Sequence, residues 1–228
     1  MSEEKKMNIG VLGGTGPEGR GLALRLAQAG FPVHLGSRST ERARDKAQEL
    51  TEKLEKAGHS ASFTGSDNRV VASASGLLFL TSPFEHAADL LRDCQAAFRE
   101  DTVLVDVTVP LVFQAGRVGL RELTERSGSE HLSKFLPGGV KIVAAFKTIP
   151  ARLLGDVDAS LDCDMFICGD SEEAKIRVLE IARRFPGLRP LDVGSLQEAG
   201  TLERMSALAI GMNKRYKAKY ARFRVVGV

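Results

Sequence analysis

The chain has 228 residues, of which 43% are hydrophobic and 27% are charged, and its formal net charge is +3. This length suits one large domain, or a medium domain with a small appendage. The charge is too small to indicate nucleic acid as a partner, and no apolar run approaches the ~20 residues of a membrane helix, so neither kind of partner is expected.

The first half of the chain alternates apolar runs with helical patterns. Residues 7–13 are predicted as a buried strand and 19–30 as a helix, with a glycine-rich loop between them. Further strands are predicted at 31–38, 61–64, 76–83 and 102–110, and further helices at 39–58 and 84–98. Such alternation predicts an α/β fold with a doubly wound parallel sheet and right-handed crossovers.

The second half continues the alternation less regularly. Residues 114–138 are polar and are predicted to be irregular, and 140–146 reads as a sixth strand. Beyond them we expect strands at 163–170 and 188–194 and helices at 171–184 and 196–216. With no internal repeat or low-complexity linker, the last part of the chain is expected to be a small extension packed on the first part.

The three cysteines do not indicate a disulfide framework or a metal site. Cys94, Cys163 and Cys168 form no CxxC pair and lie near no pair of histidines. The N-terminus also lacks the long apolar core and the small-residue cleavage site of a signal peptide. We therefore expect reduced thiols, no bound metal and a cytoplasmic location.

The loop after the first strand matches the pattern GxGxxG. It is made of Gly14, Thr15, Gly16, Pro17, Glu18 and Gly19. Between a strand and a helix, such glycines permit a sharp turn, a close approach of the backbone to a diphosphate, and tight packing of helix on strand. Helix N-terminal amides then bind the diphosphate charge. The alternative is a tight turn without a ligand.

The end of the second strand indicates which dinucleotide binds. Proteins that prefer NAD usually carry Asp or Glu there to bind the ribose 2′-hydroxyl, whereas this chain has Ser37 and Arg38. A hydroxyl and a guanidinium can bind a 2′-phosphate, and Arg42 can add a second cation from the next helix. We therefore predict NADP as the cofactor, with a solvated helix residue as the alternative for Arg42.

Two further strand ends are predicted to line the ligand cleft, because ligands of open α/β sheets lie over the carboxyl ends of the strands. The predicted residues are Thr81, Ser82, Pro83, His86, Val109 and Pro110. For His86, a helix-terminal histidine bonded to the backbone is the alternative.

Six segments resemble the NADP-dependent oxidoreductases of coenzyme F420, a deazaflavin. They are LGGTGPEGRGLALRLAQAG, GSRSTERARDKA, TSPFEHAADL, KTIPAR, CGDSEEAK and GLRPLDVGSL, within a match from Asn8 to about Leu208. The resemblance implies an NADP-binding Rossmann domain at 1–150 and a small C-terminal domain at 151–228 that helps to form a homodimer. It also implies a cleft in which deazaflavin stacks on nicotinamide and a hydride passes directly between them.

Two features depart from that family's pattern. Lys147 in AAFKTIP occupies a position where relatives carry histidine or asparagine. It could pair with an anionic ring or a substrate carboxylate, donate a proton to a carbonyl or imine, or be a surface lysine at a strand end. The basic, aromatic segment 213–228 could bind the phosphate and polyglutamate tail of F420, another polyanion or RNA, or be a charged helix end or exposed tail.

Three functions remain open from the sequence. The leading one is hydride transfer between NADP(H) and F420, which needs proximity and orientation more than acid–base chemistry. The second is an NADPH-dependent reductase of another pterin-like, keto or imine substrate, with Lys147 as the catalytic acid. The third is a non-enzymatic redox sensor that binds NADP(H) and signals through the basic segment 213–228.

Overall fold

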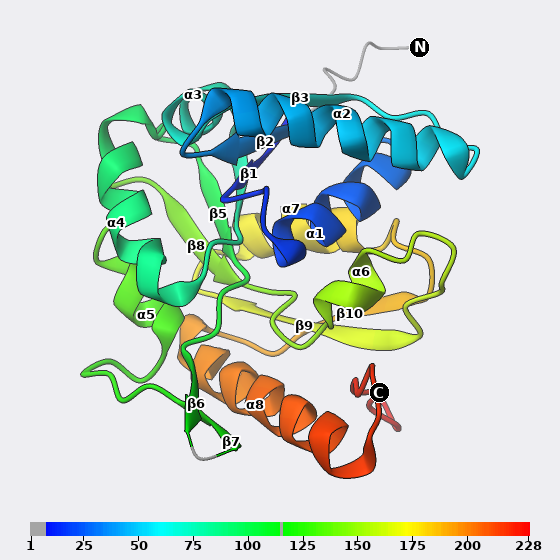
Figure 1. Cartoon of the computed structure of the whole chain (residues 1–228). Coiled ribbons are helices and arrows are strands. Elements are labelled where there is room, and N and C mark those ends of the chain that lie inside the picture. Colours follow the sequence, from blue (N-terminus) through cyan, green and yellow to red (C-terminus); the bar gives the residue numbers. More distant parts are fainter. Residues whose placement is uncertain (1–7, 115) are drawn as a thin grey trace.

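The computed structural model describes residues 8–114 and 116–228. Outside the described residues lie residues 1–7 of the predicted N-terminal domain, and with them residue 7 of the strand predicted at 7–13. Residue 115, in the stretch predicted as irregular, also lies outside them. An eight-stranded sheet forms the centre of the molecule (Figure 1). Its strands are β1 (Ile9–Leu12), β2 (Val33–Ser37), β3 (Phe63–Asp67), β4 (Leu77–Leu80), β5 (Val103–Asp106), β8 (Lys141–Ala144), β9 (Cys163–Gly169) and β10 (Leu188–Asp192).

The strand order is β10-β9-β8-β5-β4-β1-β2-β3. All neighbours pair in parallel except β8 and β9, which are antiparallel, with Val143 opposite Gly169. The chain starts in the middle of the sheet at β1, adds β2 and β3 on one side, and then returns to add β4 on the other. The predicted doubly wound α/β fold is therefore confirmed, and its switch point lies between β1 and β4.

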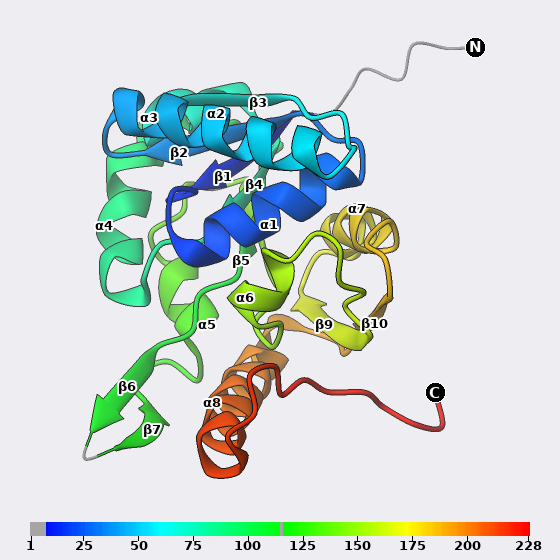
Figure 2. The same cartoon turned by 45° about the vertical axis from the view of Figure 1, so that its right-hand side comes forward.

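Helices cover both faces of the sheet (Figures 1 and 2). One face packs against α1 (Pro17–Gln28), α2 (Thr40–Lys56) and α7 (Glu172–Ala182), and the other against α3 (Asn68–Ala74), α4 (Phe84–Cys94), α5 (Gly128–Ser133) and, beside β8 and β9, α8 (Ala199–Tyr216). The sequence of β4 is continuously apolar because both of its faces are buried: Phe79 packs in the core on one side of the sheet and Leu78 in the core on the other. Two short 3-10 turns, Gln95–Ala97 and Leu196–Glu198, adjoin α4 and α8.

Several short elements differ from the sequence prediction. Helix α3 and the four-residue helix α6 (Ala151–Leu154) were not predicted, and neither were α5 and the hairpin of β6 (Leu111–Gln114) and β7 (Arg117–Leu120). The strand predicted at 102–110 ends early, at Asp106, because the Asp106 carboxylate accepts hydrogen bonds from the backbone N–H and the hydroxyl of Thr108, at 2.9 and 2.7 Å. This turn bends the chain out of the sheet and toward the hairpin.

The C-terminal extension is present. Strands β9 and β10 continue the central sheet, and α8 crosses beneath it. After α8 the chain reverses at Lys217, whose φ of 52° is left-handed, and the backbone N–H of Asp164 in β9 donates to Phe223 O at 2.9 Å. Figure 2 shows this last segment leaving α8 and extending below β9 and β10. A domain boundary at residue 150 stays a prediction.

No helix in the described part of the chain has the length and hydropathy needed to span a membrane.

Candidate functional site

The loop between β1 and α1 has the geometry of a phosphate-binding turn. Gly13 adopts a left-handed φ of 68°, and its backbone N–H donates to Asn68 Oδ1 at 3.1 Å. A Cβ on Gly19 would lie 2.6 Å from Gly14 Cα, so only glycine lets α1 approach the loop this closely. Helix α1 begins at Pro17, and within the described residues no side chain caps its N-terminus. The amides of the first turn are therefore available to an anion.

A cavity of about 740 Å³ lies on one side of this loop. It is lined by Gly13, Thr15, Gly16, Ser37, Arg38, Arg42, Asp67, Asn68, Arg69, Ser82, Pro83, His86, Asp89, Leu90, Asp93 and Cys94. We call it the first cavity. Its volume is in the range of small-molecule and cofactor sites.

The structure brings the predicted 2′-phosphate residues together in the first cavity. Ser37 ends β2 and is buried, whereas Arg38 and Arg42 are exposed at its rim. Arg42 is placed there because α2 starts beside β2, with the Ser39 hydroxyl capping it by accepting from the backbone N–H of Arg42 at 3.3 Å. Arg69 of α3 adds a third guanidinium that the sequence did not indicate, because α3 itself was not predicted.

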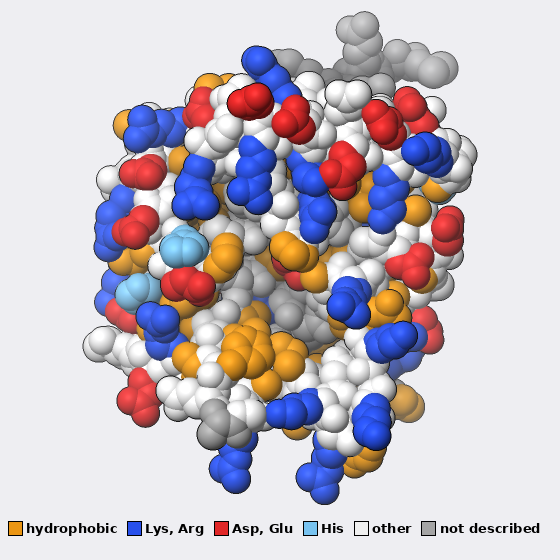
Figure 3. Space-filling model, in the orientation of Figure 1, with side chains coloured by type: hydrophobic (Ala, Val, Ile, Leu, Met, Phe, Trp, Pro, Cys, Tyr) orange, Lys and Arg blue, Asp and Glu red, His pale blue; other side chains and the backbone are white. Residues whose placement is uncertain are grey.

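A second cavity of about 530 Å³ lies on the other side of the loop. It is lined by Gly16, Pro17, Glu18, Thr81, Ser82, Pro83, Phe84, Val107, Thr108, Val109, Leu111, Lys147, Thr148, Ile149, Pro150, Ala151, Arg152, Ser206, Ala209, Ile210, Asn213, Lys219 and Ala221. The two cavities share Gly16, Ser82 and Pro83, so together they form one groove over the switch point. Figure 3 shows the hollow across the middle of this face.

The predicted residues at the end of β4 differ in what they can offer a ligand. Thr81 uses both its backbone N–H and its hydroxyl to donate to Leu12 O, each at 3.0 Å, and so ties β4 to β1. Ser82 has a buried hydroxyl that finds no hydrogen-bond partner among residues 8–114 and 116–228. Buried polar groups are normally satisfied. The unpartnered Ser82 Oγ, at the junction of the two cavities, therefore fits a site that is completed by a bound dinucleotide.

The other predicted strand-end residues are placed unequally. His86 is exposed in the first turn of α4 and lines the first cavity, and its backbone N–H donates to Pro83 O at 3.0 Å. Val109 lines the second cavity. Pro110 lines neither cavity within the described residues; it is buried, and its carbonyl accepts from the backbone N–H of Arg121 at 2.7 Å.

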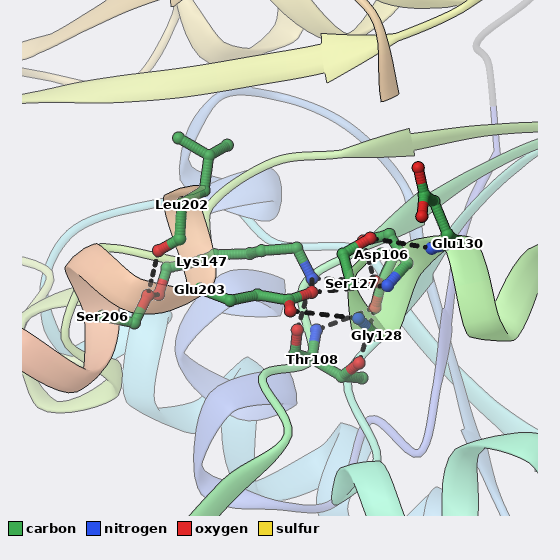
Figure 4. Close-up of polar contacts among 10 residues, drawn as sticks. Asp106, Thr108, Ser127, Gly128, Glu130, Lys147, Leu202, Glu203 and Ser206 are labelled. Carbon is green, nitrogen blue, oxygen red and sulfur yellow. Dashed lines mark hydrogen bonds and ion pairs between the residues drawn. The ribbon is translucent and has the colours of Figure 1, made fainter. Parts of the chain in front are cut away.

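Lys147 points into a buried cluster of charges (Figure 4). Its Nζ lies 2.8 Å from Asp106 Oδ2 and 3.4 Å from Glu203 Oε1, and it also donates to the Thr108 carbonyl. The Lys147 side chain is 0% exposed, so the alternative of a surface lysine is wrong. We call Lys147, Asp106 and Glu203 the buried triad.

The two carboxylates of the buried triad also accept hydrogen bonds from uncharged donors. Glu203 accepts from the backbone N–H of Gly128 at 3.0 Å, and the Ser129 hydroxyl donates to Asp106 Oδ2 at 2.5 Å. Burial alone would lower the pKa of Lys147, but the charges of Asp106 and Glu203 outweigh it and raise this pKa above its ordinary value. Lys147 therefore stays an ammonium ion and joins β5, the end of β8, and α8, the helix that forms one wall of the second cavity.

The basic C-terminal segment contributes to the second cavity. Asn213 Oδ1 accepts from the backbone N–H of Ala221 at 2.8 Å, which closes the chain reversal after α8 and brings Lys219 to the cavity. Arg152 of α6 lines the same cavity. Arg152 ends the segment KTIPAR, which carries part of the family resemblance, but it was not predicted as a site residue.

A second group of missed residues comes from α8, and they are Ser206, Ala209, Ile210 and Asn213. Helical periodicity predicted the helix, but it could not show which face would meet the cavity.

Comparisons with known proteins agree with this geometry. Residues 8–110 match the family model described as NADP oxidoreductase, coenzyme F420-dependent. The chain is 33% identical over 224 residues to the F420-dependent NADP reductase of Methanocaldococcus jannaschii, covering 97% of this chain and 99% of that protein. It is 34% identical over 225 residues to the enzyme of the same name from Methanothermobacter marburgensis, with coverage of 97% and 99%.

Solved structures have the same fold. A crystal structure of an Arthrobacter protein proposed to be an F420-dependent NADP reductase superposes with a TM-score of 0.78 at 23% identity, covering 96% of this chain and 99% of that one. A pyrroline-5-carboxylate reductase of Coxiella burnetii superposes with a TM-score of 0.62 at 15% identity, covering 93% and 67%. The Rossmann-like fold is thus confirmed, and, on the near full-length identity to the two archaeal reductases, this chain belongs to the family of F420-dependent NADP reductases.

Proposed function

We propose that this protein is an NADP-dependent oxidoreductase that transfers a hydride between NADP(H) and coenzyme F420. The observation that carries the proposal is the pair of cavities that meet at Gly16, Ser82 and Pro83. One cavity is rimmed by arginines beside a phosphate-binding turn, and the other is walled by apolar side chains. Two extended coenzymes can thus be brought end to end over the switch point.

The glycine loop and the first cavity are proposed to bind the diphosphate and the adenosine half of NADP(H). The backbone N–H groups of Thr15 and Glu18 would bind the diphosphate, because those of Gly14 and Gly16 already donate to Gly36 O and Gly13 O. Ser37, Arg38 and Arg42 would bind the 2′-phosphate. The nicotinamide end then reaches the second cavity past the unpartnered Ser82 hydroxyl, with Pro83 and Val109 as walls. His86 lies at the rim of the first cavity, and Thr81 lines the second cavity and ties β4 to β1.

The second cavity is proposed to hold the deazaflavin. When both coenzymes are bound, NADPH supplies a hydride from its nicotinamide and F420 accepts it on its deazaflavin ring. The apolar walls from Val109, Ile149 and Ile210 exclude water and hold the two rings together, which is the main contribution the protein can make to such a transfer. Lys219 and Arg152 face the same cavity and suit the phosphate and glutamate tail of F420.

The buried triad bears on the second candidate function. Lys147 as acid for a keto or imine substrate needs an ammonium group that reaches the cavity with a free proton, but its Nζ is engaged by Asp106, Glu203 and the Thr108 carbonyl. We therefore propose that Lys147 positions the cavity wall and does not transfer a proton.

The test is to mix the purified protein with NADPH and, separately, with F420, keto or imine acceptors while following nicotinamide absorbance. The proposal is supported if NADPH is oxidised when F420 is the acceptor and is not oxidised with the keto or imine acceptors. Oxidation by a keto or imine compound supports the second candidate, and tight NADPH binding without oxidation by any acceptor supports the redox sensor.

A homodimer and a cytoplasmic location are further proposals. Four large apolar side chains, Phe113 of β6 and Leu208, Met212 and Tyr216 of α8, are between 41% and 70% exposed and suit contact with a second copy. The three cysteines are buried free thiols, which suits a reducing compartment. Light scattering tests the dimer.

A further inference from the structure

Glu18 has a buried carboxyl oxygen without a partner. It is the second residue of α1 and lines the second cavity beside Pro17, Thr81 and Ser82. Its Oε1 is buried and accepts no hydrogen bond within the described residues. The only other buried side-chain atoms of this kind in the described part of the chain are the hydroxyls of Ser75 and Ser82.

The charged groups around Glu18 do not compensate it. Three other titratable side chains line the second cavity, and they are Lys147, Arg152 and Lys219. Lys147 is held by the two carboxylates of the buried triad, and no ion pair joins Arg152 or Lys219 to Glu18 in the described residues. On α1 itself, Arg20 pairs with a different carboxylate, since its Nη1 lies 3.8 Å from Glu49 Oε1. Burial therefore raises the pKa of Glu18 to about 8, with no opposing charge that lowers it.

Ionisation of an unpaired carboxyl in this buried place costs free energy unless a ligand brings the opposite charge. A dinucleotide whose diphosphate binds the loop and whose adenosine half fills the first cavity extends its nicotinamide into the second cavity, where Glu18 lies. The nicotinamide ring is cationic in NADP+ and neutral in NADPH. The two redox forms therefore differ in the charge that they present to Glu18.

We propose that Glu18 is a titratable counter-charge for the nicotinamide ring, ionised when NADP+ is bound and neutral when NADPH is bound. The inference rests on the proposed function for the placement of NADP(H), but it does not depend on F420. When the hydride leaves NADPH with both electrons, the ring becomes cationic and Glu18 releases one proton to solvent. Reduction of NADP+ reverses this, and Glu18 takes up one proton. Glu18 changes its protonation and not its oxidation state.

The experiment measures the dissociation constants of NADP+ and NADPH from about pH 6 to about pH 9, which spans the pKa of about 8 given by burial. The ratio of the two constants is the readout, because the diphosphate, the 2′-phosphate and His86 act on both forms alike. As the pH rises, NADP+ should gain affinity relative to NADPH by about tenfold or more, which is one unit of difference between the Glu18 pKa values in the two complexes.

Two variants make the experiment specific. Glu18→Gln keeps the shape of the side chain but cannot ionise, so its ratio should not change with pH. Glu85→Gln is the matched control, because Glu85 is an exposed carboxylate in the first turn of α4 that lines neither cavity. Its ratio should follow the wild-type curve.

Proton release provides a second readout that needs no variant. Near pH 8 Glu18 is partly ionised in the free protein, so wild-type protein in weak buffer should release protons from Glu18 when it binds NADP+ and take protons up at Glu18 when it binds NADPH. A flat wild-type ratio, equal proton release for both forms, or a Glu18→Gln ratio with the wild-type slope would overturn the inference. If the protein binds neither coenzyme, the proposed function fails and this inference fails with it; if both bind with a flat ratio, only the inference fails.

Discussion

Replacement of Lys147 tests whether the buried triad is structural or catalytic. In Lys147→Met, Asp106 and Glu203 would be left without the ammonium that lies 2.8 and 3.4 Å from them, in a site where their side chains are 0% and 2% exposed. Removal of one partner of a buried ion pair costs about 3–5 kcal/mol, because the remaining charge is buried and uncompensated. For a chain of this size that corresponds to a fall in Tm of roughly 6–20 °C.

The assay is denaturant unfolding followed by circular dichroism, at neutral and at acid pH. The destabilisation should shrink at acid pH, because a protonated carboxyl needs no cation and burial already raises the pKa of Glu203. Lys141→Met is the matched control, since Lys141 is the first residue of β8, the strand that precedes Lys147, but is exposed, and it should change stability by less than about 0.5 kcal/mol. A Lys147→Met protein that is as stable as wild type but has lost its turnover would refute the structural role and indicate proton transfer.

Three further predictions concern the cavities and the loop. Arg38→Ala should weaken NADPH binding by about 10- to 150-fold, because a charge-assisted hydrogen bond of about 1.5–3 kcal/mol is lost. Calorimetry should show that the binding of NADH, which has no 2′-phosphate, is unchanged. An equal loss of affinity for both coenzymes would contradict the assignment of Arg38 to the 2′-phosphate. Gly19→Ala places a Cβ 2.6 Å from backbone and should cost about 1–3 kcal/mol of unfolding free energy, whereas Gly211→Ala in α8 meets open space and should not destabilise; equal effects would contradict this packing argument. Lys219→Ala should raise KM for F420 but not for a deazaflavin that lacks the phosphate and glutamate tail, and a rise for both would argue against a tail contact.

The features that could be predicted from the sequence are those encoded locally. The glycine loop, the strand before it and the helix after it lie within about twenty residues, and Ser37 and Arg38 follow the next strand directly. Position at the carboxyl end of a parallel strand was enough to place these residues beside the first cavity. The β4 end was predicted for the same reason, because a strand buried on both faces has a clear apolar signature.

The features that could not be predicted depend on distant contacts. The partners of Lys147 come from β5 and α8, so its sequence neighbourhood AAFKTIP could not show whether it is buried. Lys219 reaches the second cavity only because the chain reverses at Lys217, a non-glycine residue with a left-handed φ. Helix α3 was missed because it has only seven residues and begins directly at the end of β3, where Asp67 caps it.

The most direct test of the central claim uses NADPH that carries deuterium at the transferred position of the nicotinamide ring. The protein is mixed with this NADPH and F420, and the reduced F420 is analysed by mass spectrometry. Direct transfer between rings brought together at the junction of the two cavities predicts that the deuterium is found on the deazaflavin carbon. Deuterium lost to water, or NADPH that is not oxidised in the presence of F420, would contradict the account.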